Sequence, residues 1–251
     1  MGNCNSFLGQ LLMFDMDSDK NSISLDISDN ENDFLSNTEL EKYIVLFFHE
    51  KEQADTWCGH GVWVGDYLIT VAHVMIDKET KKNLSYLYYK FDGKFKRVDS
   101  SDIVFDGRDG LEDDIDNIHH DLIIFRVKGM NSPFVLNSNP FSTPLSVYAR
   151  TYRAPDHSVW FIYNILCQTG INYVPEKNCR GEYPRWENCL LVSGDFISGN
   201  SGAPIYRQNI VYGILIGETK IKEYPFKVYN FLNAIYIQEI LSRIKCFLSE
   251  I

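Results

Sequence analysis

The sequence predicts an all-β protein that ends in one α-helix. Val, Ile, Tyr and Phe, the residues that strands favour, are abundant and recur in short apolar runs. A later stretch has instead the three- and four-residue apolar spacing of a helix. The 251 residues, 45% of them hydrophobic, are enough to bury a sizeable core within one domain.

The predicted strands follow one another along the chain. Val62 and Val64 precede a Gly-Asp turn and residues 68–71 form a short apolar strand after it, so this stretch is expected to be a hairpin. The other predicted strands lie at residues 43–48, 86–91, 122–127, 147–152, 159–165, 190–192, from 205 onward and 211–217.

The helix is predicted at the C-terminus, over about residues 237–250. Its apolar side chains recur at intervals of three and four residues, which places them on one helical face. These residues are Ile237, Ile240, Leu241, Ile244, Phe247, Leu248 and Ile251.

A serine between glycines is the strongest candidate for chemistry. The sequence Gly-Asn-Ser-Gly-Ala-Pro occupies residues 199–204. A serine hydroxyl is almost fully protonated at pH 7, so it needs a base within hydrogen-bond reach and donors for the oxyanion. The glycines let the backbone bend and let a substrate carbonyl approach the N–H groups of Gly199 and Ser201. We therefore take Ser201 as the candidate nucleophile and these N–H groups as the candidate oxyanion hole.

Two upstream residues have the properties of its partners. His73 follows the short strand at residues 68–71, and histidine is the usual general base because its pKa lies near working pH. Asp121 stands at the head of the apolar run 122–127, where a carboxylate can accept from the imidazole N–H and set its tautomer.

The segments Thr-Val-Ala-His-Val (70–74), Asp-Leu-Ile-Ile (121–124) and Gly-Asn-Ser-Gly-Ala-Pro together resemble the chymotrypsin-like (trypsin-like) serine peptidases. The order His, Asp, Ser is that of the family, with 48 residues from His73 to Asp121 and 80 from Asp121 to Ser201. The resemblance covers about residues 43–251 and is closer to bacterial, viral and HtrA-type members than to digestive enzymes.

This resemblance implies two six-stranded antiparallel β-barrels with a C-terminal α-helix packed on the second barrel. The first barrel is expected over about residues 41–135 and the second over about 145–236, with the active-site cleft between them. Residues 233–237 resemble the last strand of HtrA-like domains. The implied activity is that of a serine endopeptidase acting on a protein or polypeptide substrate without a cofactor or a metal.

The resemblance also points to substrate-binding residues. Asp195, six residues before the candidate nucleophile, stands where the family often has the base of the specificity pocket, and would favour Lys or Arg in the substrate. Alternatively, Asp195 lies in a solvated turn beside Gly194. Residues 211–217 resemble the strand that pairs with substrate and walls the pocket; Leu215 there argues against the histidine of glutamate-specific relatives, and Gly217 ends the strand.

The chain departs from the digestive enzymes at two places. Asn200 replaces the aspartate that pairs with a new N-terminus after zymogen cleavage, so activation by such cleavage is not expected. Val74 replaces the cysteine after the histidine, so Cys58 lacks the family's usual disulfide partner.

Other polar residues have simpler interpretations. Asp116 is an alternative acid, but the acidic run 112–116 suits a solvated loop because like charges resist burial. His119 and His120 are interpreted as loop residues. His60 lies close to Cys58, yet no second Cys/His pair at ligand spacing supports a metal site.

The first 40 residues are expected to be a separate, flexible segment, because they are acidic and offer few groups to bury. The opening Met-Gly-Asn-Cys-Asn-Ser fits the N-myristoylation pattern at Gly2, and Cys4 offers a second acylation site. Two acyl chains would support membrane association in a eukaryotic cell or its virus.

The net charge and the cysteine content limit the partners and the cellular compartment that we expect. The net charge of −10 argues against a nucleic-acid partner, which requires clustered Lys and Arg. None of the six cysteines makes a family-typical pair, which favours free thiols in a reducing compartment such as the cytoplasm, although Cys179 and Cys189 have a spacing that could close a small loop. No basic region precedes the first apolar stretch, so classical secretion is not expected.

Two functional classes follow. The first is a serine endopeptidase, a viral or intracellular processing protease, that uses His73, Asp121 and Ser201. The alternative is a catalytically silent binding or structural module on the same scaffold, because a fold does not by itself guarantee chemistry.

Overall fold

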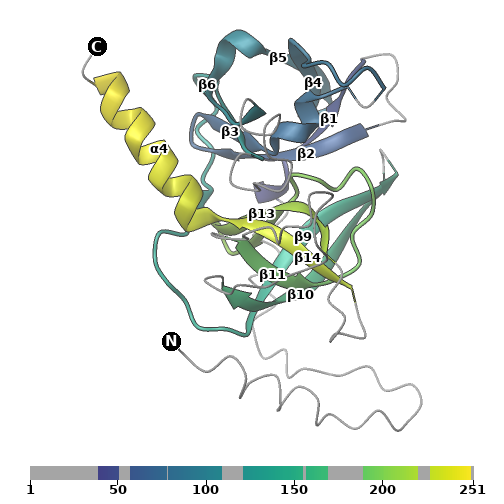
Figure 1. Ribbon diagram of the computed structural model, residues 1–251, viewed down its shortest axis with the longest axis vertical. Coiled ribbons are helices and arrows are strands. Elements are labelled where there is room, and N and C mark those ends of the chain that lie inside the picture. The colour runs from purple at the N-terminus through teal and green to yellow at the C-terminus, as the bar shows by residue number, and fades with distance from the viewer. Residues whose placement is uncertain are drawn as a thin grey trace, which may run out of the picture.

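The computed structural model describes residues 39–50, 57–77, 79–108, 121–154, 157–168, 189–219 and 227–249. Two β-sheets form the body, one above the other in Figure 1, and the helix α4 (Ala234–Ser249) lies beside them. The all-β fold class with a C-terminal helix is therefore confirmed.

The first sheet holds seven strands in the spatial order β5-β4-β1-β2-β3-β7-β6. In the described part of the chain no pairing joins β5 to β6, so this sheet is curled and open, whereas a closed six-stranded barrel was expected. Its strands are β1 (Ile44–Phe48), β2 (Trp57–Val64), β3 (Tyr67–Thr70), β4 (Tyr86–Phe91), β5 (Lys94–Asp99), β6 (Ile103–Asp106) and β7 (Ile123–Arg126).

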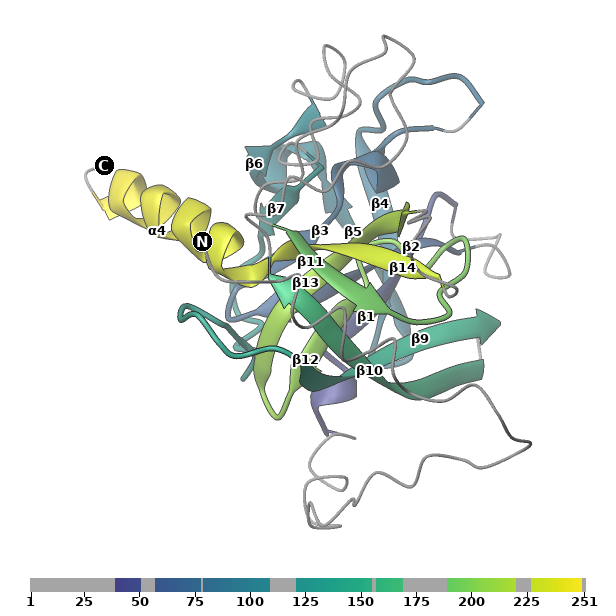
Figure 2. The same cartoon turned by 60° about the horizontal axis from the view of Figure 1, so that its bottom comes forward.

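The second sheet closes into a six-stranded barrel, as predicted, because β12 pairs with both β9 and β13. Figure 2 shows these strands curling around one another. The short strand β8 adds to β13 in parallel. The strands are β8 (Val135–Leu136), β9 (Leu145–Ala154), β10 (His157–Gln168), β11 (Cys189–Ser193), β12 (Pro204–Arg207), β13 (Ile210–Thr219) and β14 (Val228–Asn233).

The apolar pattern predicted most strands, and β4 has the predicted bounds. Strand β5 was missed because lysines and an arginine interrupt its apolar residues. Its register follows from the two-residue turn before it: Asp92 and Gly93 both have positive φ, of 50° and 72°, which suits the right-handed twist of a hairpin.

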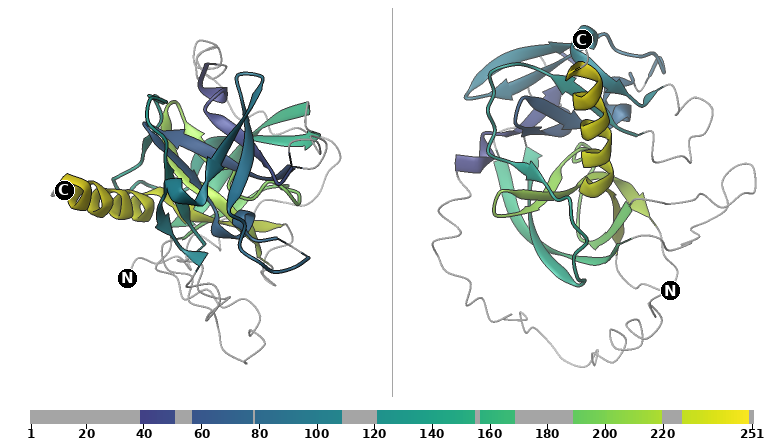
Figure 3. Two further views of the ribbon diagram at one scale, coloured as in Figure 1. Left: turned by 90° about the horizontal axis from the view of Figure 1, so that it is seen from above. Right: turned by 90° about the vertical axis from the view of Figure 1, so that its left-hand side faces the viewer.

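The expectation of a strand through residues 233–237 was wrong beyond Asn233. The carboxamide oxygen Oδ1 of Asn233 accepts a hydrogen bond of 3.0 Å from the backbone N–H of Ile235, so Asn233 caps the helix that begins at Ala234. Ile237, Ile240 and Leu241 are buried, and the helix contacts β8, β13 and β14. Figure 3 shows α4 extending away from the sheets. Phe247, in the last part of this helix, is 66% exposed.

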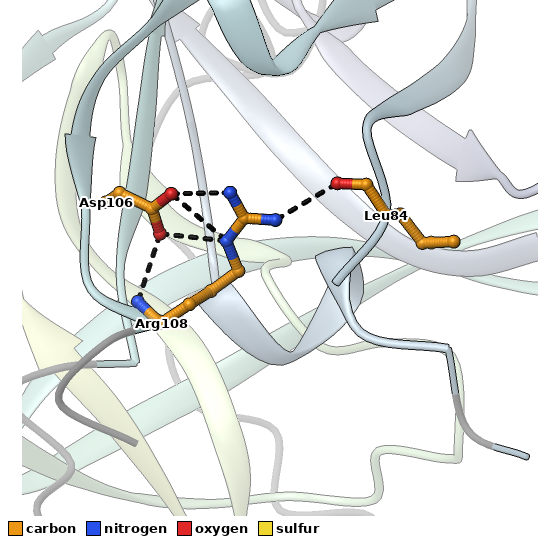
Figure 4. Close-up of polar contacts among 3 residues, drawn as sticks. All are labelled: Leu84, Asp106 and Arg108. Atoms are coloured by element: carbon orange, nitrogen blue, oxygen red, sulfur yellow. Dashed lines mark hydrogen bonds and ion pairs between the residues drawn. The ribbon is translucent and has the colours of Figure 1, made fainter. Parts of the chain in front are cut away.

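Two arginines join segments that are distant along the chain. Arg150 Nη1 on β9 lies 2.8 Å from Glu41 Oε2, just before β1, which links the two sheets. At the end of β6, Arg108 binds the Asp106 carboxylate and donates from Nη1 to the carbonyl oxygen of Leu84 at 3.0 Å (Figure 4). The hydrogen bond from Arg108 to Leu84 ties the end of β6 to the segment before β4.

Candidate active site

The pairing of two strands brings His73 and Asp121 together. Strands β3 and β7 are antiparallel with Thr70 opposite Ile123, so the residues after β3 lie beside those before β7. His73 belongs to the 3₁₀ helix η1 (Ala72–Met75), whose other side chains are buried and anchor it. Asp121 is 5% exposed, whereas the His73 side chain is 37% exposed and faces solvent in part.

The Asp121 carboxylate holds His73 through two hydrogen bonds. The ring nitrogen Nδ1 lies 2.8 Å from Oδ2, and the backbone N–H of His73 donates to Oδ1 at 2.9 Å. An ionised carboxylate only accepts, so Nδ1 carries the proton and, in the neutral ring, Nε2 is the acceptor. The ring is thus fixed in position and in tautomer.

Two consecutive turns shape the backbone around Ser201. The N–H of Asn200 donates to the carbonyl of Ile197 at 3.0 Å, and the N–H of Ala203 donates to the carbonyl of Asn200 at 2.9 Å. The third residues of these turns are Gly199, with φ of 90°, and Gly202, with φ of 82°. A positive φ at that position favours glycine, which explains why glycines flank the Asn-Ser pair.

Both glycines also lie against neighbouring groups. A Cβ on Gly199 would stand 2.7 Å from Trp57 Nε1, and one on Gly202 would overlap the carbonyl oxygen of His60. Contact as well as conformation therefore requires glycine at these positions.

The loop of residues 197–203, called the serine loop below, meets the segment that carries His73 at strand β2. The backbone N–H of His60 donates to the carbonyl oxygen of Ser201 at 2.7 Å. A Cβ on Gly59 would stand 3.1 Å from that same oxygen and would overlap the side chain of Val74, the residue after His73. The Ser201 backbone and helix η1 thus approach one point on the first sheet.

The far side of the loop is held by β13. The N–H of Gly202 donates to the carbonyl of Leu215 at 2.7 Å, and the N–H of Leu215 returns a bond of 2.9 Å to Ala203. Leu215 is buried, and Gly217 is half-buried just past an irregularity in the pairing with β14. Asn200 is buried, and its Oδ1 accepts from the N–H of Ile197 at 3.0 Å.

Asp195 is exposed, and the next residue turns inward. Phe196 is buried against Tyr163, Tyr229 and Phe231, and its carbonyl oxygen accepts from the Tyr229 hydroxyl at 2.9 Å. Burial raises the pKa of Tyr229. Asp195 is thus the exposed neighbour, along the chain, of a residue in this aromatic cluster, and its role as the base of a specificity pocket stays a prediction.

His60 was considered in the sequence only as a metal ligand, and its contact with the serine loop was not predicted. It is fully buried, and its Nδ1 lies 2.9 Å from the carbonyl oxygen of Gly199. Burial lowers its pKa to about 3, with a smaller contribution from the charge of Arg150. The available signal was the Gly-His-Gly pattern of residues 59–61, because glycines inside a strand mark close approach of another backbone.

Several predicted residues lie outside the described residues and their structure is not discussed: Gly2, Cys4, Asp116, His119, His120 and Cys179. The described ranges contain no cluster of three or more His, Cys, Asp or Glu side chains suited to a metal ion. In the same ranges no helix combines the length and apolar character needed to cross a membrane.

Comparison with known proteins gives matches in structure only. No protein-family model matches the sequence, and no curated protein matches it either. The active form of the Rv3671c protease from M. tuberculosis is similar, with a TM-score of 0.58 and 17% identity, over 83% of this chain and 83% of that chain.

Two further structures are comparable. Neuropsin, a serine protease expressed in the limbic system of mouse brain, has a TM-score of 0.57 at 13% identity, over 80% of this chain and 93% of its own. The serine endoprotease from Yersinia pestis has a TM-score of 0.55 at 16% identity, over 83% of this chain and 66% of its own. The chain has two β-sheets and a C-terminal helix, and its structural neighbours are serine proteases. We conclude that the chain has the fold of the chymotrypsin-like serine proteases.

Proposed function

We propose that this protein is a serine endopeptidase that cuts protein or polypeptide substrates through an acyl-enzyme. The observation that carries the proposal is the doubly bonded His73–Asp121 pair, at 2.8 and 2.9 Å, together with a hydrogen-bonded loop that carries Ser201. A histidine oriented by a buried carboxylate is what a serine hydroxyl needs for activation.

Each residue has one role in the proposed reaction. Ser201 Oγ attacks the scissile carbonyl carbon while His73 Nε2 accepts the hydroxyl proton. The oxyanion is stabilised by the N–H groups of Gly199 and Ser201, at about 3 to 4 kcal/mol per donor. His73 then gives its proton to the leaving amine, and an acyl-Ser201 remains. Water, deprotonated by His73, releases the acid and restores the hydroxyl.

Asp121 acts through His73. Its ionised carboxylate keeps Nδ1 protonated and stabilises the imidazolium that forms when Nε2 accepts the proton. Because Asp121 is buried and bonded twice to His73, the ring needs little reorganisation when the charge develops.

The proposed substrate preference is for Lys or Arg before the cleaved bond. Asp195 would supply the negative charge, and the strand that includes Leu215 and Gly217 would pair with the substrate backbone. The support is the position of Asp195 six residues before Ser201 and its exposure to solvent.

Reaction with a fluorophosphonate probe tests the proposal, because this reagent requires an activated serine. We expect stoichiometric labelling of the wild-type protein and none of Ser201→Ala, with His73→Ala strongly slowed. Labelling that persists in Ser201→Ala would show that another residue is the reactive nucleophile and would contradict the role of Ser201. A folded wild-type protein that does not react at all favours the alternative of a catalytically silent binding module.

A further inference from the structure

We infer that His60 is a positioning residue, which holds the Gly199–Asn200 peptide and thereby sets the orientation of the proposed oxyanion-binding N–H groups. The catalytic part of this inference rests on the proposed function. The structural part, that the His60 ring orders the serine loop, does not.

His60 contacts the serine loop through side chain and backbone. Its ring Nδ1 lies 2.9 Å from the carbonyl oxygen of Gly199, and its backbone N–H donates to the carbonyl oxygen of Ser201 at 2.7 Å. Its own carbonyl oxygen accepts from Thr70 Oγ1 at 2.6 Å and lies against the Cα of Gly202. One residue of the first sheet thus contacts three of the four residues from 199 to 202.

The two ends of the Gly199–Asn200 peptide are held from opposite sides. In a trans peptide the C=O and N–H bonds point in opposite directions. Here the oxygen of Gly199 meets His60 Nδ1, while the N–H of Asn200 meets the oxygen of Ile197. Rotating this peptide would break two hydrogen bonds, at least one of them buried, and leaving a buried polar group unpaired is costly.

Glycine makes this external hold necessary. Gly199, at φ of 90°, has no Cβ to restrict its backbone, so the residue can adopt many orientations in isolation. The N–H groups proposed to bind the oxyanion belong to the peptides on either side of the Gly199–Asn200 peptide. Fixing the central peptide therefore limits the directions in which both can point.

The imidazole suits this task because it is neutral and buried. The carbonyl oxygen of Gly199 can only accept, so Nδ1 carries the hydrogen. Burial lowers the pKa of His60 to about 3, which keeps the ring uncharged at neutral pH. An uncharged ring does not attract the oxyanion away from the N–H groups of Gly199 and Ser201, as a charged ring would.

Two substitutions separate the donor from the bulk of the ring. In His60→Asn the amide nitrogen Nδ2 stands where Nδ1 stood, so donation to Gly199 is retained. In His60→Leu the side chain is apolar and the donor is lost. Ser132→Ala is the matched control. Ser132 Oγ donates a buried hydrogen bond of 2.7 Å to the carbonyl oxygen of Trp63, which lies on β2 like His60 but does not contact the serine loop through this bond.

The first measurement is amide hydrogen exchange of residues 197–203. We expect faster exchange in His60→Leu, and near wild-type exchange in His60→Asn and Ser132→Ala. This readout needs no catalysis. Equal exchange in all variants would overturn the inference even if the enzyme is active.

The second measurement is enzyme kinetics. The values of kcat and KM are determined for the best substrate found by profiling a peptide library. The concentration of active sites, which is needed for kcat, is titrated with the fluorophosphonate. Removing one oxyanion donor outright costs about 10²- to 10³-fold in kcat, so we expect His60→Leu to lose about 10- to 100-fold, with KM nearly unchanged. His60→Asn should regain most of the loss.

The outcomes separate the two claims. If the wild-type protein does not react with the probe but the exchange pattern is as expected, the proposed function fails and the structural part stands. If kcat per titrated site is unchanged in His60→Leu, His60 has no catalytic role.

Discussion

Both carboxylate oxygens of Asp121 accept hydrogen bonds from a single residue, His73: one from its ring and one from its backbone. The backbone bond anchors the carboxylate relative to helix η1, and the ring bond then fixes the imidazole relative to the same carboxylate. The orientation of the ring therefore depends on Asp121 twice.

Replacing Asp121 by asparagine tests this dependence. The amide oxygen of Asp121→Asn can still accept from the His73 backbone, but its NH₂ group then faces Nδ1 and favours the wrong tautomer. We expect the rate of fluorophosphonate labelling to fall by up to about 10⁴-fold while the protein stays folded. Asp106→Asn, which disrupts the pair with Arg108 in Figure 4, is the control and should label at nearly the wild-type rate. Equal rates for both variants would contradict the role of Asp121.

Two glycines with similar backbone angles distinguish strain from steric overlap. Gly93 and Gly202 have φ of 72° and 82°, but a Cβ on Gly93 meets nothing within 4 Å, whereas one on Gly202 overlaps the His60 carbonyl. We expect Gly93→Ala to lower the free energy of unfolding by about 1 to 2 kcal/mol, from backbone strain alone. Gly202→Ala should cost clearly more in urea denaturation, and a similar cost for both would show that the loop can yield.

The buried imidazole of His60 predicts a pH dependence of stability. Its pKa is 6.5 ordinarily and about 3 in the folded protein. Between these values the unfolded chain binds a proton that the folded protein does not, so stability falls as the pH drops from 6.5 towards 3. The limiting slope is about 1.4 kcal/mol per pH unit, and above pH 6.5 the contribution is constant.

His60→Asn isolates this effect, because asparagine does not titrate. The difference in free energy of unfolding between wild type and variant should move in favour of the variant as the pH is lowered from 7.5 to 4.5. A pH-independent difference would mean that the pKa of His60 is the same in the folded and the unfolded protein, so that burial does not lower it.

Asp195 predicts selectivity for basic residues. A peptide library digested by the wild-type protein should show Lys or Arg before the cleaved bond, and Asp195→Asn should reduce this preference at least about tenfold because a charge partner is removed. Digestion that is indifferent to basic residues would discard the pocket assignment and leave the catalytic residues untouched.

The N-terminal pattern predicts acylation at Gly2, with Cys4 as the second site. In fractionated eukaryotic cells that express the protein, we expect a membrane-bound fraction that is lost in Gly2→Ala and reduced in Cys4→Ser, because one acyl chain alone binds weakly. An unchanged distribution of Gly2→Ala would exclude the anchor.

Much of the fold follows from local signals. Apolar runs located strands such as β4, the helical spacing located α4, and the two glycines around Asn200 and Ser201 marked the turns that they form. Strand β5 escaped because lysines and an arginine interrupt its apolar residues, although the Asp-Gly turn before it was a usable signal. Residues near one another in sequence carry these signals because propensity and turn chemistry act over a few residues.

The sequence by itself determined the strand pattern, the C-terminal helix and the candidate roles of His73, Asp121 and Ser201. Only the tertiary structure decided that the first sheet stays open in its described part and that His60 binds Gly199, a residue 139 positions further along the chain. Such contacts depend on how the two sheets pack against each other, and no local pattern of residues specifies which residues of the two sheets meet.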